Sequence, residues 1–351
     1  MRPLLLVPLL AACLQGTPAR AAPEEAGLLA AHEMRHLAAT FPGRSVGTQR
    51  AGAAAEYLAR RLTQMGYVVE RQAFDSSYTV EKPGAEKLSQ PAEGINLIAR
   101  RPGGSGPVVL VGAHYDSRPV RKADDARQHI GGAALAGLDD NASGVGVALA
   151  LAERLAAKPL QHEVRFVLFS GVEVGLKGSR AYVDSLAAEE RARVRLMINL
   201  DSLITGDRLY FHAGPKTVSA NPAAGFARDM ALEIARARHI KAETNPGLNP
   251  KYPAGTGCCS DLEPFDEAGI PVLAVEATNW TLGERDGYTQ TDRPGIPGGM
   301  SWHKTDVDKA EVIDRVLPGR VEQRAREVTE VLGTLLERLA RPAKGQGAPD
   351  F

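Results

Sequence analysis

Short apolar runs alternate with helical segments along most of this chain, and this alternation limits the fold more than any other feature. Residues 108–113 read Val-Val-Leu-Val-Gly-Ala, an unbroken apolar run typical of a strand buried on both faces of a sheet. Comparable runs are separated by segments whose apolar residues lie three and four positions apart, the spacing of helices. Strands that alternate with helices over this length predict an α/β fold, a three-layer α/β/α sandwich with a mostly parallel central sheet.

The expected elements follow from these runs. We expect strands at 67–74, 96–100, 108–113, 164–169, 196–200, 208–212 and 271–276, with a polar hairpin-like insertion between the first two. We expect helices within 22–66 and at 144–157, 179–186, 222–238 and 317–339.

Size and charge exclude some classes of protein. With 351 residues, of which 44% are apolar, the chain can bury a large core and holds one or two domains. The formal charge is zero and the pI is near 7.1, so there is no electrostatic footprint for nucleic acid or an anionic membrane.

The first residues have the pattern of a secretion signal. Met1-Arg-Pro precedes an apolar run that is too short to span a bilayer, and Ala19-Arg-Ala21 supplies small residues for cleavage after Ala21. We therefore expect residues 1–21 to be a signal peptide and the mature protein to be exported, with the periplasm as the expected compartment. A lipoprotein anchored through Cys13, or full secretion, is the alternative. No later segment is expected to cross a membrane.

Cleavage after Ala21 would leave only the neighbours Cys258 and Cys259. Any intramolecular disulfide in an oxidising compartment must then join adjacent residues. A free thiol pair and two buried cysteines without a redox role are the alternatives.

Five residues spread over nearly two hundred positions have the character of metal ligands: His114, Asp140, Glu173, Asp201 and His303. Two imidazoles and three carboxylates suit two Zn²⁺ ions, which favour nitrogen and oxygen ligands. Three of the five, together with Glu276, directly follow apolar strands, where sites form in parallel α/β sheets. Each residue alone also has an ordinary explanation; Asp140, for example, could belong to a turn and helix cap.

The motifs around these residues resemble those of the co-catalytic di-zinc exopeptidases, a family that includes bacterial leucyl aminopeptidases. The matching motifs are His114-x-Asp116, Asp140-Asn-x-Ser-Gly144, Glu173-x-Gly-Leu-x-Gly-Ser179, Asn199-x-Asp201 and the late His303. The resemblance covers residues 95–310. Longer strings extend it over nearly the whole mature chain: Phe41-Pro-Gly-Arg44, Asn245-Pro-Gly-Leu-Asn249, Gly255-Thr-Gly-Cys-Cys259 and Val275-Glu-Ala-Thr-Asn-Trp280.

The resemblance implies a role for each position. Asp140 would bridge two zinc ions, with a cis peptide bond after it; His114 and Asp201 would complete one site, and Glu173 and His303 the other. Asp116 would orient His114, and Asp139 would be a neighbour without a ligand role. The resemblance also implies one exopeptidase-like domain over residues 22–341. The composition of residues 342–351 predicts a disordered tail after it.

The sequence departs from the family at Val172. Members of the family have Glu-Glu-x-Gly, and the first Glu takes a proton from the attacking water and later passes it to the leaving amine. Here the segment is Gly171-Val-Glu-Val-Gly175, and valine can neither accept nor donate a proton. Loss of a positioned general base costs ~10²–10⁴ in rate. A neighbouring acid such as Asp261, Glu276 or Asp124 could substitute. Leu262 also stands where many relatives have His.

Three functions are compatible with these features. The first is an exported di-zinc aminopeptidase that acts on peptide or protein N-termini, with a preference for basic residues such as Arg implied by the resemblance. The second is a catalytically impaired, metal-binding homologue that binds peptides. The third is the N-terminal cyclisation performed by glutaminyl cyclases, which Val172 disfavours because that reaction also needs an acid at the proton-transfer position.

Overall fold

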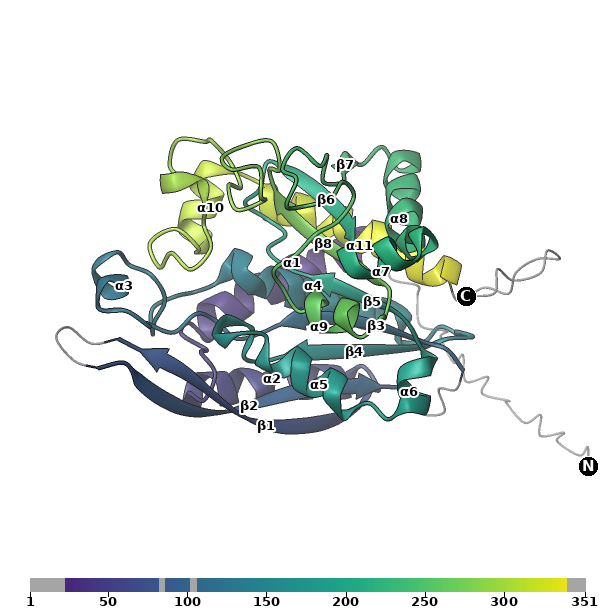
Figure 1. Ribbon diagram of the computed structural model, residues 1–351, viewed down its shortest axis with the longest axis horizontal. Coiled ribbons are helices and arrows are strands. Elements are labelled where there is room, and N and C mark those ends of the chain that lie inside the picture. Colours follow the sequence, from purple (N-terminus) through teal and green to yellow (C-terminus); the bar gives the residue numbers. More distant parts are fainter. Residues whose placement is uncertain (1–22, 82–85, 102–105, 340–351) are drawn as a thin grey trace, which may run out of the picture.

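The computed structural model describes residues 23–81, 86–101 and 106–339 (Figure 1). The expected signal peptide, Cys13 and the expected tail over 342–351 lie outside the described residues. No helix within these ranges is both long enough and apolar enough to cross a membrane.

A mixed sheet forms the middle layer, and its strands follow the order β1-β2-β4-β3-β5-β8-β6-β7. The four central strands, β4, β3, β5 and β8, are parallel, whereas β2 and β6 join them in the antiparallel direction. The strands are β1 (Val68–Val80), β2 (Leu88–Arg100), β3 (Val108–His114), β4 (Glu163–Phe169), β5 (Val194–Leu200), β6 (Arg208–Ala213), β7 (Ala242–Glu243) and β8 (Val272–Thr278).

Helices cover both faces of the sheet, as Figure 1 shows. One layer contains α1 (Pro23–Thr40), α2 (Gln49–Gln64), α4 (Ser143–Ala156), α8 (Phe226–Ala237) and α11 (Arg320–Leu339), whose apolar faces share one large core with the sheet. The opposite face packs on a second core built with α5 (Lys177–Ser185) and α9 (Leu262–Glu267), with α6 (Ala188–Arg193) beside β5. The short helices α3 (Ala123–Arg127), α7 (Pro215–Ala220) and α10 (Ala310–Val316) lie in the connections. The predicted three-layer sandwich with a mostly parallel centre is confirmed.

The structure corrects two details of the sequence interpretation. The polar hairpin-like insertion expected between the first two strands is a hairpin, but it continues those strands, because β1 and β2 pair without interruption from Val68 opposite Arg100 to Val80 opposite Leu88. β1 alternates between exposed and partly buried residues, and β2 is exposed over Leu88–Pro91, so this part of the hairpin lacks the apolar run that marks the central strands. The short helices α3, α6, α7, α9 and α10 and the two-residue strand β7 were also missed, and α6 buries none of its residues.

A buried arginine joins the connections that lie at the carboxyl edge of the parallel strands. The Arg44 side chain is fully buried, and its guanidinium donates to the carbonyls of Tyr115 at 2.6 Å, Ala136 at 2.5 Å and Gly137 at 2.7 Å. Burial lowers the pKa of Arg44, which the acidic groups around it partly oppose. Arg44 therefore ties the segment after β3 to the segment before Asp140.

We expect Arg44→Met to lower the free energy of unfolding by about 3 kcal/mol, because three buried carbonyls lose their donors at about 1 kcal/mol or more each. Urea unfolding followed by circular dichroism measures this change. The control is Arg50→Met, which removes an exposed arginine with one long hydrogen bond to the Thr40 carbonyl, 3.2 Å. Equal stabilities of the two variants would show that Arg44 does not organise these connections.

Candidate metal centre

The five predicted ligands meet at the carboxyl ends of the parallel strands. His114 ends β3, Asp201 follows β5, and Glu173 lies in η2 (Val172–Val174), the short turn after β4. Asp140 belongs to η1 (Leu138–Ala142), which leads into α4, and His303 belongs to the loop before α10. All five line a cavity of about 310 Å³.

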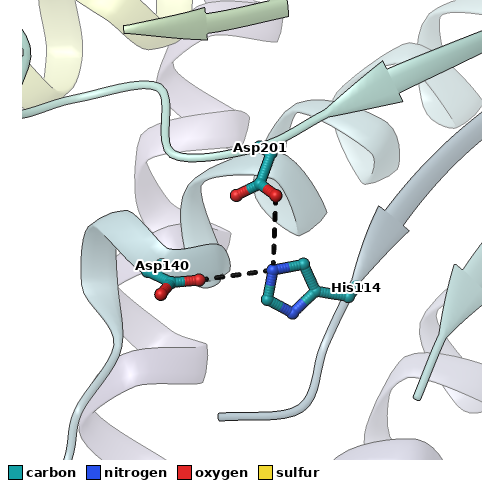
Figure 2. A group of neighbouring side chains, drawn as sticks. All are labelled: His114, Asp140 and Asp201. Carbon is teal, nitrogen blue, oxygen red and sulfur yellow. Dashed lines mark ion pairs between the residues drawn. The ribbon is translucent and has the colours of Figure 1, made fainter. Parts of the chain in front are cut away.

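His114 faces two of the carboxylates (Figure 2). Its Nε2 lies 3.3 Å from Asp140 Oδ1 and 3.6 Å from Asp201 Oδ2. The Nδ1 atom of the same ring lies 3.1 Å from the backbone carbonyl oxygen of Asp116. Because a carbonyl can only accept, Nδ1 donates to the Asp116 carbonyl, and Nε2 is the ring atom that faces the two carboxylates and would bind a metal.

His303 faces the other pair of carboxylates. Its Nε2 lies 3.1 Å from Glu173 Oε2 and 3.3 Å from Asp140 Oδ2. Asp140 is therefore shared, with one carboxylate oxygen turned toward each imidazole. In each of the two triplets, His114–Asp140–Asp201 and Asp140–Glu173–His303, one ligand atom per residue lies within 4.8 Å of the others.

The imidazole nitrogens and carboxylate oxygens of these five residues, and their burial, suit the binding of cations. Glu173 Oε1 is buried and has no hydrogen-bond partner among the described residues, which is costly for a carboxylate oxygen unless a cation or water meets it. Burial, followed by repulsion from Glu173, raises the pKa of Asp140 to about 6. Burial opposes protonation of His303, yet the carboxylates of Glu173 and Asp140 raise its pKa above the usual value. Dications bound between these carboxylates would reduce the repulsion among them.

Asp116 supports the site in a way that the sequence interpretation only partly describes. Its carboxylate was expected to hold His114, but Oδ1 lies 3.6 Å from His114 Nδ1, beyond hydrogen-bond length. The backbone carbonyl makes that contact instead, and the carboxylate accepts the backbone N–H groups of Val172 and Glu173, each at 3.3 Å. Asp116 therefore links His114 to the turn that carries Glu173.

Asp201 is oriented by two serines that the sequence interpretation missed as support residues. Ser260 Oγ donates to Asp201 Oδ2 at 2.5 Å, and Ser202 Oγ donates to Oδ1 at 2.9 Å. Asn199 Nδ2 in turn donates to Ser260 Oγ at 3.0 Å, which fixes the direction of the serine hydroxyl.

Two further buried acids, Asp308 and Asp139, hold the segment that leads to Asp140. Asp308 accepts the N–H groups of Asp139 at 2.6 Å and Asp140 at 3.1 Å. Asp139 is not part of either ligand triplet; its carboxylate accepts from Ile204 N at 2.7 Å and from Gln290 and Ser301 side chains. The peptide bond between Asp140 and Asn141 is cis, as the resemblance implied.

A glycine closes this segment against the sheet. A Cβ on Gly144 would lie 2.4 Å from the Leu200 carbonyl oxygen and 2.6 Å from Asn141 Oδ1. The Asn141 side chain uses that space, donating to the Leu200 carbonyl and accepting from Gly144 N. The α4 helix thus begins in close contact with the end of β5.

Val172 lines the same cavity as the five ligand residues and is only partly buried. Of the three acids considered as substitutes, Glu276 also lines the cavity. Asp261 is fully buried outside the lining, and burial raises its pKa to about 7. Asp124 is exposed on α3 and pairs with Arg127. Leu262 lines the cavity at the start of α9.

Glu276 is fixed through one of its oxygens. His212 Nδ1 accepts the Asn245 N–H at 3.2 Å, so Nε2 carries the proton and donates to Glu276 Oε1 at 2.9 Å. Trp280 Nε1 donates to the same oxygen at 2.7 Å. The second carboxylate oxygen, Oε2, is not used by these bonds.

Cys258 and Cys259 form a disulfide, and both line the cavity next to Ser260. The adjacent-residue disulfide, one of the alternatives in the sequence interpretation, is therefore present.

Comparisons with known proteins agree with this geometry. The family model described as "Peptidase family M28" matches residues 96–329. The chain is 42% identical over 325 residues to the alkaline phosphatase isozyme conversion protein of Escherichia coli K12, covering 92% of this chain and 94% of that protein. A zinc aminopeptidase from Bacillus subtilis has the same fold, with a TM-score of 0.66 at 17% identity over 91% of this chain and 96% of that one. Porphyromonas gingivalis glutaminyl cyclase also shares the fold, with a TM-score of 0.63 at 21% identity over 89% of this chain and 98% of that one.

A family description that spans most of the folded chain, and a relative similar over nearly its full length, lead to one conclusion: this chain belongs to peptidase family M28.

Proposed function

We propose that this protein is an exported zinc-dependent aminopeptidase that removes N-terminal residues from peptides or proteins. The observation that carries the proposal is the Asp140 carboxylate, which is shared between two imidazole–carboxylate triplets in one cavity. Membership of a peptidase family supports hydrolysis as the reaction.

Two zinc ions per chain fit the donors. His114, Asp140 and Asp201 would hold one, Asp140, Glu173 and His303 the other, and imidazole nitrogen with carboxylate oxygen is a usual zinc ligand set. When bound, zinc polarises a substrate carbonyl and lowers the pKa of water. The similar fold of a zinc aminopeptidase from Bacillus subtilis supports the choice of metal.

The chain's own residues would position the substrate. Glu276, Asp286 and Trp280 line the cavity. A carboxylate held through one oxygen, with its other oxygen free, can bind a cationic group. We therefore propose a preference for basic N-terminal residues, Arg in particular.

Proton transfer is the step that this chain performs poorly in our proposal. Val172 occupies the family's general-base position and lines the cavity, but its side chain cannot exchange a proton. A catalytically impaired homologue that binds peptides is the second candidate function, and this same residue favours it.

We expect equilibrium dialysis and elemental analysis to find two zinc ions per chain, and chelation to lower the melting temperature. Bound ions stabilise the folded state, by about 4 kcal/mol at a thousandfold excess over Kd, and relieve repulsion among three carboxylates. Asp140→Asn should weaken both sites, whereas Glu173→Gln should weaken one. Asp184→Asn, an exposed carboxylate on α5, is the control. A melting temperature unchanged by chelation would contradict the metal centre.

Val172→Glu should raise kcat for aminoacyl-anilides by ~10²-fold or more, within the range of general-base catalysis. KM should change much less, because the ligands and cavity walls already exist. Val172→Gln matches the new side chain in size without its basicity and should not raise kcat. If the unaltered protein already turns over at ordinary aminopeptidase rates and Val172→Glu adds nothing, another residue carries the proton; Glu276→Gln is then the next variant.

Export predicts a mature N-terminus. Mass spectrometry of protein from the periplasmic fraction of an expressing bacterium should find a chain beginning at Ala22, since Ala19-Arg-Ala21 fits the cleavage pattern. A lipid-modified Cys13 would support the lipoprotein alternative, and an uncleaved chain in the cytosol would contradict export.

A further inference from the structure

The cavity carries opposite charges on either side of the five ligand residues. Glu276 lies on β8 beside the end of β5, where the Asp201 N–H donates to the Val275 carbonyl at 3.1 Å. Arg118 and Arg121 line the cavity from the segment between β3 and α3. The acidic side is thus next to Asp201.

The arginine side is next to Glu173 and His303. The Arg118 carbonyl accepts the Gly132 N–H at 2.9 Å, and the adjoining Gly131 N–H donates to the His303 carbonyl at 2.8 Å. The ligand cluster therefore separates the two arginines from Glu276.

Neither guanidinium has a partner within the part of the chain that the structure describes. Among the described residues, no hydrogen bond or ion pair within 4.0 Å joins a carboxylate to Arg118 or Arg121, and Arg118 Nε is buried with no partner at all. Arg121 is close enough to Glu81 to affect its pKa, but Glu81 pairs with Lys87 at 2.8 Å. Buried or half-buried arginines elsewhere, such as Arg154 and Arg165, pair with glutamates.

The segment that carries the two arginines is fixed by its backbone. Asp125 Oδ2 accepts the N–H groups of Arg121 and Lys122, each at 2.9 Å, and the Arg121 carbonyl accepts the Glu81 N–H at 2.7 Å. Two cations on an ordered segment, partly buried and unpaired, form a site for an anion. The guanidinium fork matches a carboxylate in particular.

We propose that Arg118 and Arg121 form a subsite for a carboxylate of the substrate on the leaving side of the scissile bond. The inference rests on the proposed aminopeptidase function, which places the scissile bond at the ligand cluster and the N-terminal residue toward Glu276. The peptide that leaves then lies toward the arginines. The carboxylate is either the C-terminus of a dipeptide or an Asp or Glu side chain just after the scissile bond.

Matched substrates test the subsite in the zinc-loaded full chain. Leu-Ala and its C-terminal amide differ only in the terminal carboxylate, and Leu-Asp-amide and Leu-Asn-amide differ only in the side-chain carboxylate. We expect KM to be about tenfold lower for the carboxylate member of at least one pair, with kcat little changed, because a charge-assisted contact binds both ground and transition states. Which pair shows the difference identifies the source of the carboxylate.

Variants assign that preference to the two arginines. In Arg118→Gln/Arg121→Gln, KM for the two members of the pair should agree within about twofold, while KM for the uncharged member stays near that of the unaltered protein. Arg118→Lys keeps the positive charge but loses the paired N–H donors of the guanidinium. It should retain only part of the preference for the carboxylate substrate. Arg60→Gln removes an exposed arginine on α2 and should leave the preference intact.

A binding measurement separates failure of the subsite from failure of the proposed function. Calorimetry measures Kd for a non-hydrolysable phosphinic analogue of Leu-Ala and for its C-terminal amide. The ratio of these two Kd values reports the carboxylate preference without turnover. An arginine-dependent ratio without hydrolysis would support the subsite and overturn the aminopeptidase function. Hydrolysis with equal KM in both pairs, or a preference that survives the double substitution, would overturn the subsite alone. No binding and no hydrolysis would overturn both.

Discussion

The Asp140 carboxylate, with one oxygen toward each of two imidazoles, is the contact on which the rest of the site depends. It lies 3.3 Å from both His114 Nε2 and His303 Nε2, residues that come from opposite ends of the domain sequence. Much of the surrounding structure serves to hold its backbone: Asp308 accepts two N–H groups there, and the buried Arg44 fixes the preceding turn. The sheet brings the five residues to one edge, and these connections fix the position of the Asp140 backbone there.

In our proposal, metal binding and proton transfer depend on different residues of this chain. The ligands are supported by Asp116, Ser202 and Ser260, which hold the turn of Glu173 and the carboxylate of Asp201. Val172 adjoins Glu173 yet takes no part in the ligand triplets. A chain can therefore keep a complete metal-binding geometry while lacking the family's proton-transfer side chain. In our proposal the cavity also keeps Glu276 on one side of the centre and Arg118 and Arg121 on the other. These charges would bind a peptide whether or not turnover is fast.

The central strands, and the position of His114 and Asp201 at the edge of the sheet, were predictable from sequence because each leaves a local signal. Asp140, Glu173 and His303 were predicted from the motifs around them instead. An unbroken apolar run marks a buried strand, and a His or Asp directly after it marks the edge where sites form. Asp308 and Ser260 leave no such signal, since their importance comes from contacts with residues 168 and 59 positions away. The β1–β2 ribbon extends further than expected because its half-exposed residues have no apolar run. Arg118 gave no signal either, because only the folded cavity shows that its charge is unpaired.

Anomalous diffraction at the zinc absorption edge, from crystals of the zinc-loaded protein, tests the central claim most directly. We predict two anomalous peaks, one on each side of the Asp140 carboxylate, with His114 and Asp201 at the first and Glu173 and His303 at the second. A single peak, or peaks away from Asp140, would contradict a centre built around that shared carboxylate.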